Sequence, residues 1–228
     1  MPTSTDLYEI ITARRDVRGE FTGAPADPET LERILAAAHA APSVGLSQPW
    51  DFIVIDDRGL RTTFRQHVLD QRAVFAASLP PERRGLFDGI RIEGILAASL
   101  SIVVTYDPTR GAPHVLGRHT IDDAGLYSVC LAIENLWLAA TAETWGVGWV
   151  SFYDERFLHD LLALPERLRS IAWLCVGPVT HLQAEPDLER QRWARRRPLT
   201  QAVHRNGWSG PLAACTDEPA PDGALPGR

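Results

Sequence analysis

The sequence predicts a layered fold of the α/β or α+β class, because short β-rich segments alternate with long helical segments. Four segments have the alternating or β-branched composition of strands: residues 50–55, 101–106, 146–152 and 171–176. The chain has 228 residues and an ordinary apolar content of 45%, so one large domain can bury a substantial core.

The helical segments are marked by apolar periodicity and by capping and breaking residues. Asp27-Pro28 gives a cap followed by a first-turn proline, and Pro42 ends the alanine-rich helix that follows. The segment 121–144 is the longest, and its small and apolar residues predict burial on most sides. The expected helices are residues 6–15, 29–40, 60–78, 81–98, 121–144 and 155–162.

The pattern changes after Pro186. Residues 186–208 form a charged arm without a face that could close a core of its own, so we expect the arm to wrap a partner subunit. Residues 1–208 are therefore the expected domain, including this arm. Residues 209–228 are rich in Pro, Gly, Ala and Asp with few apolar anchors, and we expect them to be disordered.

Composition excludes several classes of function. The net charge of −6 argues against a nucleic-acid partner, which favours a basic face. The three cysteines form no CxxC pair, and we see neither a secretion signal nor an uninterrupted membrane span, so we expect a cytoplasmic protein. All 23 basic residues are arginine, so an anion site must be built from guanidinium groups and backbone amides.

Several familiar site patterns are absent from the sequence. There is no GxGxxG after the first strand, no GxxxxGK[ST] loop and no GxSxG. His114 and His119 flank a Gly-rich loop without a third ligand at metal spacing, so we expect no metal site.

Arg14, Arg15 and Arg18 are the first candidate site. Three forked cations within five residues suit a phosphate, since each can donate two parallel hydrogen bonds. The same spacing also fits a solvated helix end, where cations are favoured by the helix dipole. Asp16 lies inside the cluster and is either a charge-balancing partner or an acid held beside a ligand to move a proton.

Three other segments carry residues of interest. The loop 41–50 presents Ser43 and Gln48 between a helix and a strand, as a ligand-contacting loop or a simple turn does. Segment 146–151 contains two glycines that could admit a flat ring and ends in Ser151, although a buried strand with a locally bonded serine fits as well. Residues 195–197 are a run of arginines before Pro198, and such runs are usually solvated.

Taken together, these segments resemble the flavin nitroreductase superfamily and, within it, the family of 5,6-dimethylbenzimidazole synthases. The motifs that carry the resemblance are RRDVR (14–18), APSVG (41–45), QPW (48–50), LGR (116–118), NLWLAA (135–140) and GVGWVS (146–151). The resemblance runs from about residue 7 to residue 204. It implies an α+β, nitroreductase-like FMN-binding fold, with a central mixed β-sheet surrounded by helices and an intertwined homodimer that holds FMN between its subunits.

The resemblance also implies site residues. It places the FMN phosphate on Arg14, Arg15 and Arg18, with Arg196 arriving from the arm and Arg195 or Arg197 as substitutes. Val17 belongs to the same binding segment, Ser43 contacts the flavin, and Arg91 approaches the ring system. Val150 and Ser151 lie against the isoalloxazine. Asp16 and Ser151 occupy the positions that matter for turnover.

The implied reaction is the fragmentation of reduced FMN by dioxygen, which gives 5,6-dimethylbenzimidazole, the lower ligand of cobalamin, and erythrose 4-phosphate. A separate flavin reductase would supply the reduced FMN. One alternative is an NAD(P)H-dependent nitroreductase or flavin reductase that conserves its FMN. Another is a flavin-binding protein without turnover.

Overall fold

The computed structural model describes residues 6–111 and 113–208, and it is built around one four-stranded sheet. The strands are β1 (Trp50–Ile55), β2 (Leu100–Tyr106), β3 (Trp145–Val150) and β4 (Arg169–Pro178), in the order β1-β2-β4-β3. Neighbouring strands are antiparallel throughout. The mixed character expected of the sheet is confined, within the described residues, to one isolated parallel bridge between Asp16 and Val147.

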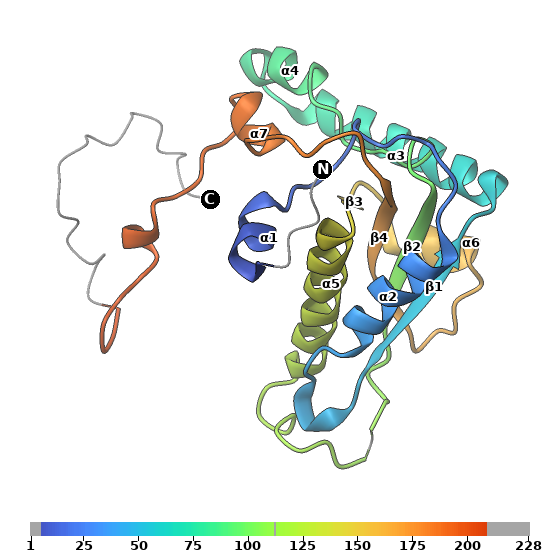
Figure 1. Ribbon diagram of the computed structural model, residues 1–228, viewed down its shortest axis with the longest axis vertical. Coiled ribbons are helices and arrows are strands. Elements are labelled where there is room, and N and C mark those ends of the chain that lie inside the picture. Colours follow the sequence, from blue (N-terminus) through green and yellow to red (C-terminus); the bar gives the residue numbers. More distant parts are fainter. Residues whose placement is uncertain (1–5, 112, 209–228) are drawn as a thin grey trace.

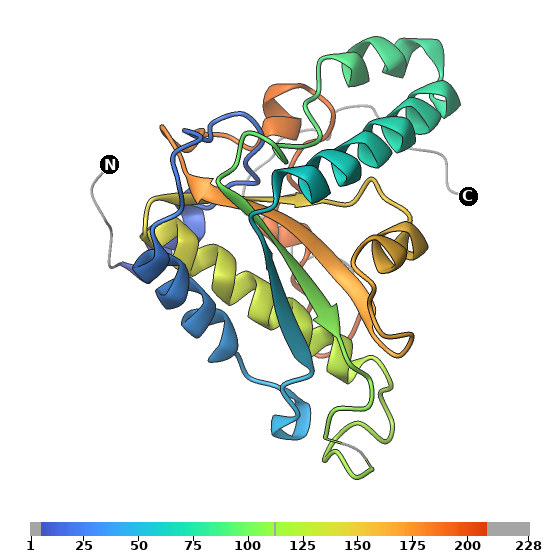
Figure 2. The ribbon, with the colours of Figure 1, turned by 90° about the vertical axis from the view of Figure 1, so that its right-hand side faces the viewer.

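Helices cover both faces of the sheet (Figure 2). On one face lie α2 (Pro28–His39) and α5 (Ala124–Ala142); on the other lie α3 (Arg58–Ser78), α4 (Pro81–Asp88) and α6 (Glu155–Leu161). Because strand side chains alternate between faces, Ile102 and Leu174 pack under α5, whereas Val103 and Trp173 pack under α3 and α6. This α+β arrangement confirms the fold class that the sequence predicts.

The central helix of the fold is α5. By length and composition alone it could cross a membrane. In this structure it packs against α2, β2 and β3, and its Val129, Ile133 and Leu136 are fully buried or nearly so. The apolar composition of α5 is therefore explained by the core that it builds.

One expected helix is shorter than predicted. Residues 81–98 were expected to be helical throughout, but α4 ends at Asp88 and residues 89–99 form an irregular segment. Buried Arg61 of α3 holds that segment by donating hydrogen bonds to the carbonyl oxygens of Ile95, Ala98 and Ser99. A side chain from another helix thus satisfies carbonyl groups near the end of this irregular segment.

The remaining elements are short. They are α1 (Leu7–Ala13), η1 (Val44–Leu46), α7 (Asp187–Arg190) and η2 (Leu199–Gln201). After α7 the chain runs away from the sheet and helices as an arm, the orange to red segment of Figure 1. Leu199 and Trp208 in this arm are 75% and 87% exposed. The tail predicted at residues 209–228 lies outside the described residues.

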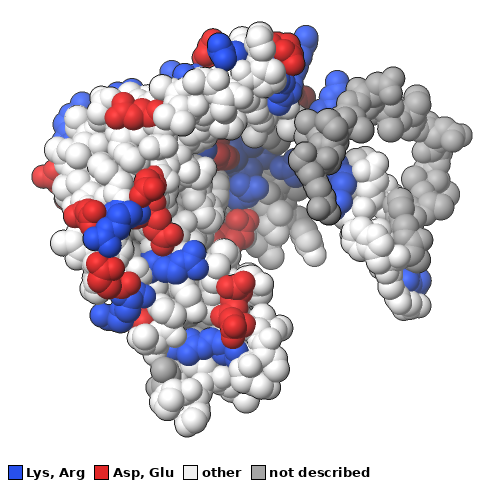
Figure 3. Space-filling view, turned by 180° about the vertical axis from the view of Figure 1, so that it is seen from behind, with Lys and Arg blue, Asp and Glu red and all other residues white. Residues whose placement is uncertain are grey.

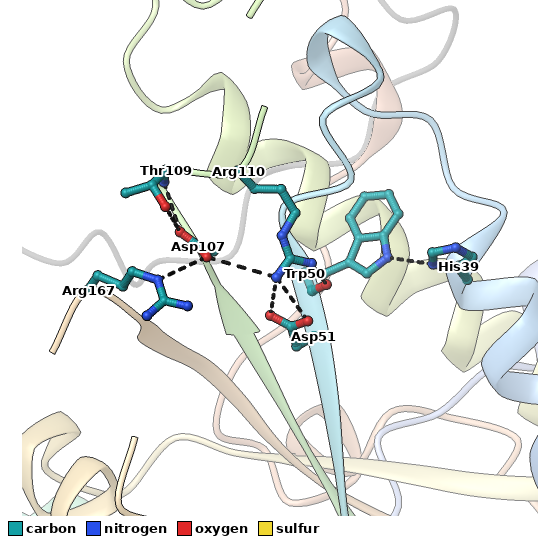
Figure 4. Close-up of polar contacts among 7 residues, drawn as sticks. All are labelled: His39, Trp50, Asp51, Asp107, Thr109, Arg110 and Arg167. Atoms are coloured by element: carbon teal, nitrogen blue, oxygen red, sulfur yellow. Dashed lines mark hydrogen bonds and ion pairs between the residues drawn. The ribbon is translucent and has the colours of Figure 1, made fainter. Parts of the chain in front are cut away.

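A polar cluster closes the end of the sheet where β1 begins and β2 ends (Figure 4): His39, Trp50, Asp51, Asp107, Thr109, Arg110 and Arg167. Asp107 is buried at its centre and accepts hydrogen bonds from the Thr109 amide and hydroxyl and from Arg167. Burial alone would raise the pKa of Asp107, but these hydrogen bonds outweigh it and hold the pKa below its ordinary value.

We predict that Asp107→Asn lowers the free energy of unfolding by about 1–3 kcal/mol near neutral pH, because the buried hydrogen bonds lose their charged acceptor. A carboxyl whose pKa is depressed in the folded state stabilises it above the unfolded pKa, and this stabilisation is lost as pH falls. Urea titrations at about pH 7 and about pH 3 should therefore show that the difference in free energy of unfolding between wild type and Asp107→Asn shrinks in acid. The control Asp51→Asn removes a more exposed partner of Arg110 and should cost under about 1 kcal/mol. If this difference in free energy of unfolding did not change with pH, the depressed pKa of Asp107 would be contradicted.

Candidate functional site

A pocket of about 570 Å³ lies where four separate segments meet. They are the chain after α1, the irregular segment after α4, the end of β3 and the start of the arm. Five arginines and two aspartates line it, so positive charge is in excess: Arg14, Arg15, Asp16, Arg18, Arg91, Asp187 and Arg196. Figure 3 shows basic side chains gathered in the hollow between the body of the molecule and the arm.

The pocket floor forms because residues 16–18 pair with the edge of β3. The Val17 amide donates to the Val147 carbonyl oxygen at 2.9 Å, and the Trp149 amide donates to Oδ1 of Asp16 at 2.9 Å. Arg18 completes the pairing by donating to the Trp149 carbonyl oxygen at 2.8 Å. These bonds cover part of an exposed strand edge and aim Asp16 and Arg18 into the pocket.

Gly148 allows this close pairing. A Cβ atom at this position would lie 2.1 Å from the Val17 carbonyl oxygen and 2.8 Å from Arg18 Nη1. Gly146 similarly faces the Val17 side chain. The two glycines of the GVGWVS motif thus make room for this chain's own residues 17 and 18, which is a different reason for their presence than the approach of a flat ring that the sequence suggested.

Asp16 is the acid at the centre of the floor. Its carboxylate is held by both terminal nitrogens of Arg18. Its side chain lines the pocket with 46% of its surface accessible, and the surrounding protein atoms partly desolvate the carboxylate. This desolvation raises the pKa of Asp16 above its ordinary value, against the opposing effects of Arg18 and of the Trp149 amide. Asp16 therefore keeps a proton to a higher pH than an exposed aspartate does.

Arg14 and Arg15 are anchored to α5 through Trp137. The Trp137 indole donates to the Arg15 carbonyl oxygen at 3.0 Å, and the Arg14 guanidinium lies 4.9 Å from the centre of the indole ring. Arg15 donates to the carbonyl oxygens of Thr12, Arg14 and Ala184, but its buried Nε has no partner among the described residues. Burial and the neighbouring cations lower the pKa of Arg15, so its charge is one that an anion would stabilise.

The structure brings most of the predicted site residues together, but not all of them. Ser151 and Arg91 line the same pocket as the arginine cluster. Of the three arginines before Pro198, Arg196 lines the pocket, whereas Arg195 and Arg197 do not. The side chains of Val17 and Val150 are buried in the core, and neither residue lines the pocket.

Ser43 lies away from the pocket of its own chain. Its hydroxyl accepts a hydrogen bond from the Gln48 amide, and the next residue, Val44, donates to Ser128 in the first turns of α5. The pocket instead adjoins Trp137 in the second half of α5. Positions 128 and 137 are nine residues apart along the helix, which is about 14 Å along its axis.

Comparison with known proteins agrees with this geometry. Residues 11–178 match the model of the nitroreductase family. The chain belongs to the nitroreductase family. It is 40% identical to a 5,6-dimethylbenzimidazole synthase of Rhodospirillum rubrum over 192 residues, which are 84% of this chain and 90% of that protein. It is 33% identical to another of Rhodobacter capsulatus, over 84% of this chain and 92% of that one. The resemblance that the motifs indicate is thereby confirmed.

A solved structure shows the same fold as this nitroreductase-family protein. Iodotyrosine deiodinase bound to FMN and 3-iodo-L-tyrosine superposes with a TM-score of 0.68 at 21% sequence identity. The match covers 89% of this chain and 99% of that one.

Sequence reasoning missed the apolar side of the pocket of this nitroreductase-family protein. Ile90, Ile92, Trp149, Phe152 and Leu188 line it beside the charged residues. Strand alternation could have found one of them, because side chains two apart in a strand share a face and Trp149 is two residues before Ser151. The isoleucines had no such signal, since they lie in the segment that was expected to be helical.

No group of three or more His, Cys, Asp or Glu side chains that could hold a metal ion occurs in residues 6–111 or 113–208. Cys130 and Cys175 are free thiols, and burial raises the pKa of Cys175 to about 12. Cys215 lies outside the part of the chain that the structure describes.

We predict that Arg18→Gln raises the pKa of Asp16 further in the ligand-free protein, because the substitution removes the strongest charge that opposes desolvation. Carbon-detected NMR of ¹³C-labelled aspartate side chains measures this pKa directly. Arg58→Gln, an exposed arginine in the first turn of α3, is the control and should leave it unchanged. An Asp16 pKa that fell in Arg18→Gln would show that the ion pair does not govern this carboxyl.

Proposed function

We propose that the protein binds FMN in the arginine-lined pocket and catalyses the oxygen-dependent fragmentation of reduced FMN to 5,6-dimethylbenzimidazole and erythrose 4-phosphate. Two relatives named for this synthase match along 84% of the chain. The structural observation that carries the proposal is that Asp16, with its raised pKa, and Ser151 line the same pocket among five arginines.

The pocket suits the phosphate of FMN. Guanidinium groups bind phosphate through paired hydrogen bonds. The buried Nε–H of Arg15 is a donor without a partner among the described residues. Arg14, Arg18 and Arg196 lie in the same pocket. The same pocket has an apolar wall, formed by Ile90, Ile92 and Trp149, which suits a flat aromatic ring.

Reduced FMN supplies both the ring that becomes the product and the electrons that react with dioxygen. This chain's own residues bind, orient and move protons. The Ser151 hydroxyl can donate to a ring nitrogen or oxygen and fix the ring against Trp149. Asp16 can accept or return a proton, because desolvation raises its pKa and keeps it protonated to a higher pH than an exposed aspartate. The apolar wall keeps water from the ring.

The direct test is to incubate the purified protein with chemically reduced FMN in air and to look for 5,6-dimethylbenzimidazole by mass spectrometry. We expect Asp16→Asn to abolish the product while FMN binding is retained, since the amide keeps the shape of the side chain but cannot take up a proton. Asp51→Asn is the matched control, because Asp51 also pairs with an arginine through both oxygens but lies in the distant cluster of Figure 4.

Three results would overturn the proposed activity. Quantitative recovery of intact FMN from the wild-type incubation would exclude fragmentation. Rapid oxidation of NADH with a nitroaromatic acceptor and conserved flavin would instead indicate a nitroreductase or flavin reductase. FMN binding with no oxygen consumption, and no kinetic effect of Asp16→Asn, would indicate a flavin-binding protein.

We also propose that the active form is a homodimer in which Ser43 of one subunit serves the pocket of the other. Leu7, Tyr8 and Ile11 of α1 are exposed, and so are Tyr127 and Leu131 of α5. A two-fold axis perpendicular to α5, lying between the exposed faces of its two copies, would make these helices antiparallel. The start of one α5, with Ser43 beside it, would then lie near the second half of the other, where Arg14 begins the pocket.

A mixing experiment tests this arrangement. We expect Asp16→Asn and Ser43→Ala each to lower product formation, and we expect activity to return when the two variants are refolded together. In a mixed dimer one pocket carries both substitutions and the other carries neither, so random pairing restores about a quarter of the wild-type sites. If Ser43 acted within its own chain, mixing would restore no activity.

The remaining partners follow from the same activity. A separate flavin reductase would supply reduced FMN, and the cytoplasm is the proposed location, where Cys130 and Cys175 would stay reduced.

A further inference from the structure

A second cavity, of about 320 Å³, lies beside the arginine-lined pocket. We call it the α3 groove, because Gln71, Val74, Phe75 and Ser78 of α3 form one side of it. The other side is the chain that follows β3, residues 151–153. Ser151 and Phe152 line both this groove and the arginine-lined pocket, so the two cavities share a wall.

The shared wall is aromatic. Phe152 meets Phe75 edge-on, with ring centres 5.5 Å apart. Its ring centre lies 6.2 Å from that of Phe87, with the two ring planes inclined by 29°. Phe75 also packs edge-on against Phe87. Phe152 is thus the aromatic side chain that the two cavities share.

The two cavities differ in charge. The arginine-lined pocket has five guanidinium groups, whereas none of the side chains that line the α3 groove is charged. The groove presents aromatic rings from Phe75, Phe152 and Tyr153. At its edges the Gln71 amide and the Ser151 hydroxyl can each donate and accept a hydrogen bond. Such a surface suits a flat, neutral heteroaromatic ring and offers no cation to a phosphate.

We propose that the α3 groove is a product site that receives the neutral benzimidazole ring after it leaves the arginine-lined pocket. This inference rests on the proposed function. Fragmentation of FMN gives one neutral aromatic product and one phosphorylated sugar, together with a fragment from the pyrimidine ring of the flavin that carries the remaining carbon and nitrogen atoms. The phosphate is attracted to the arginines, and the ring is attracted to the uncharged aromatic wall next to Ser151. The two products are thus separated by charge between adjoining cavities.

The same contrast argues against other occupants of the groove. FMN itself carries a phosphate that would lose its arginine partners there. The continuity of the groove with the pocket, through Ser151 and Phe152, favours a molecule formed in that pocket over one that arrives from outside.

Binding to the FMN-loaded protein tests the proposal. Oxidised FMN fills the arginine-lined pocket, and 5,6-dimethylbenzimidazole is then titrated while ligand-observed NMR records binding. We expect binding that does not displace FMN. Val74→Arg should weaken it by at least about tenfold with FMN affinity unchanged, because Val74 is 65% exposed at the groove and a long cation there blocks a neutral ring. Val54→Arg is the matched control, an exposed valine on β1 away from the groove.

Phe75→Ala provides a second variant, which removes one aromatic wall without adding charge. It should also weaken binding of the ring. The proposal is overturned if the ring fails to bind the FMN-loaded protein, if it binds only by displacing FMN, or if Val74→Arg and Val54→Arg behave alike. A failure of the product-site proposal can be distinguished from a failure of the proposed function. Ring binding is measured without turnover, whereas fragmentation is measured by the product formed from reduced FMN.

Discussion

The pairing of residues 16–18 with the edge of β3 places Asp16 and Arg18 in the candidate site. One main-chain hydrogen bond, from the Val17 amide to the Val147 carbonyl oxygen, and one hydrogen bond from the Trp149 amide to the Asp16 carboxylate fix this segment. The segment leaves α1 at Ala13, and the Arg14 guanidinium then lies over the Trp137 ring while the Arg15 carbonyl oxygen accepts from the Trp137 indole. Gly148 permits the approach, because any side chain there would collide with the Val17 carbonyl. A short stretch of backbone pairing thus sets the geometry of a charged site.

Desolvation and charge act against each other in this site. Arginine neighbours would ordinarily lower the pKa of a carboxyl, yet the pKa of Asp16 is raised because the pocket walls displace water. Asp107 at the other end of the sheet shows the reverse balance, in which hydrogen bonds outweigh burial. Each carboxylate accepts three hydrogen bonds, but those of Asp16 do not outweigh its desolvation, whereas those that Asp107 accepts from a backbone amide, a hydroxyl and a guanidinium group do. Two aspartates near arginines in one chain therefore have opposite pKa shifts.

Much of the fold could be predicted from the sequence, because apolar periodicity and capping residues act locally. The strand at 50–55 has the predicted bounds, and the helix at 29–40 is displaced by one residue. The segment 89–99 could not be predicted, since its conformation depends on hydrogen bonds from Arg61, which is far away in sequence. The family resemblance anticipated Arg15, Asp16 and Ser151 as neighbours in one pocket. The distance of Ser43 from that pocket follows from the direction of α5, which residue spacing does not contain.

The absence of lysine from the chain has a chemical consequence at this site. An open-chain sugar phosphate carries an aldehyde, and a lysine amine beside it would condense to a Schiff base. All five cations of the pocket are guanidinium groups, which stay protonated at physiological pH and are poor nucleophiles. A pocket that attracts the phosphate through arginine alone can therefore hold and release a reactive aldehyde without being modified by it.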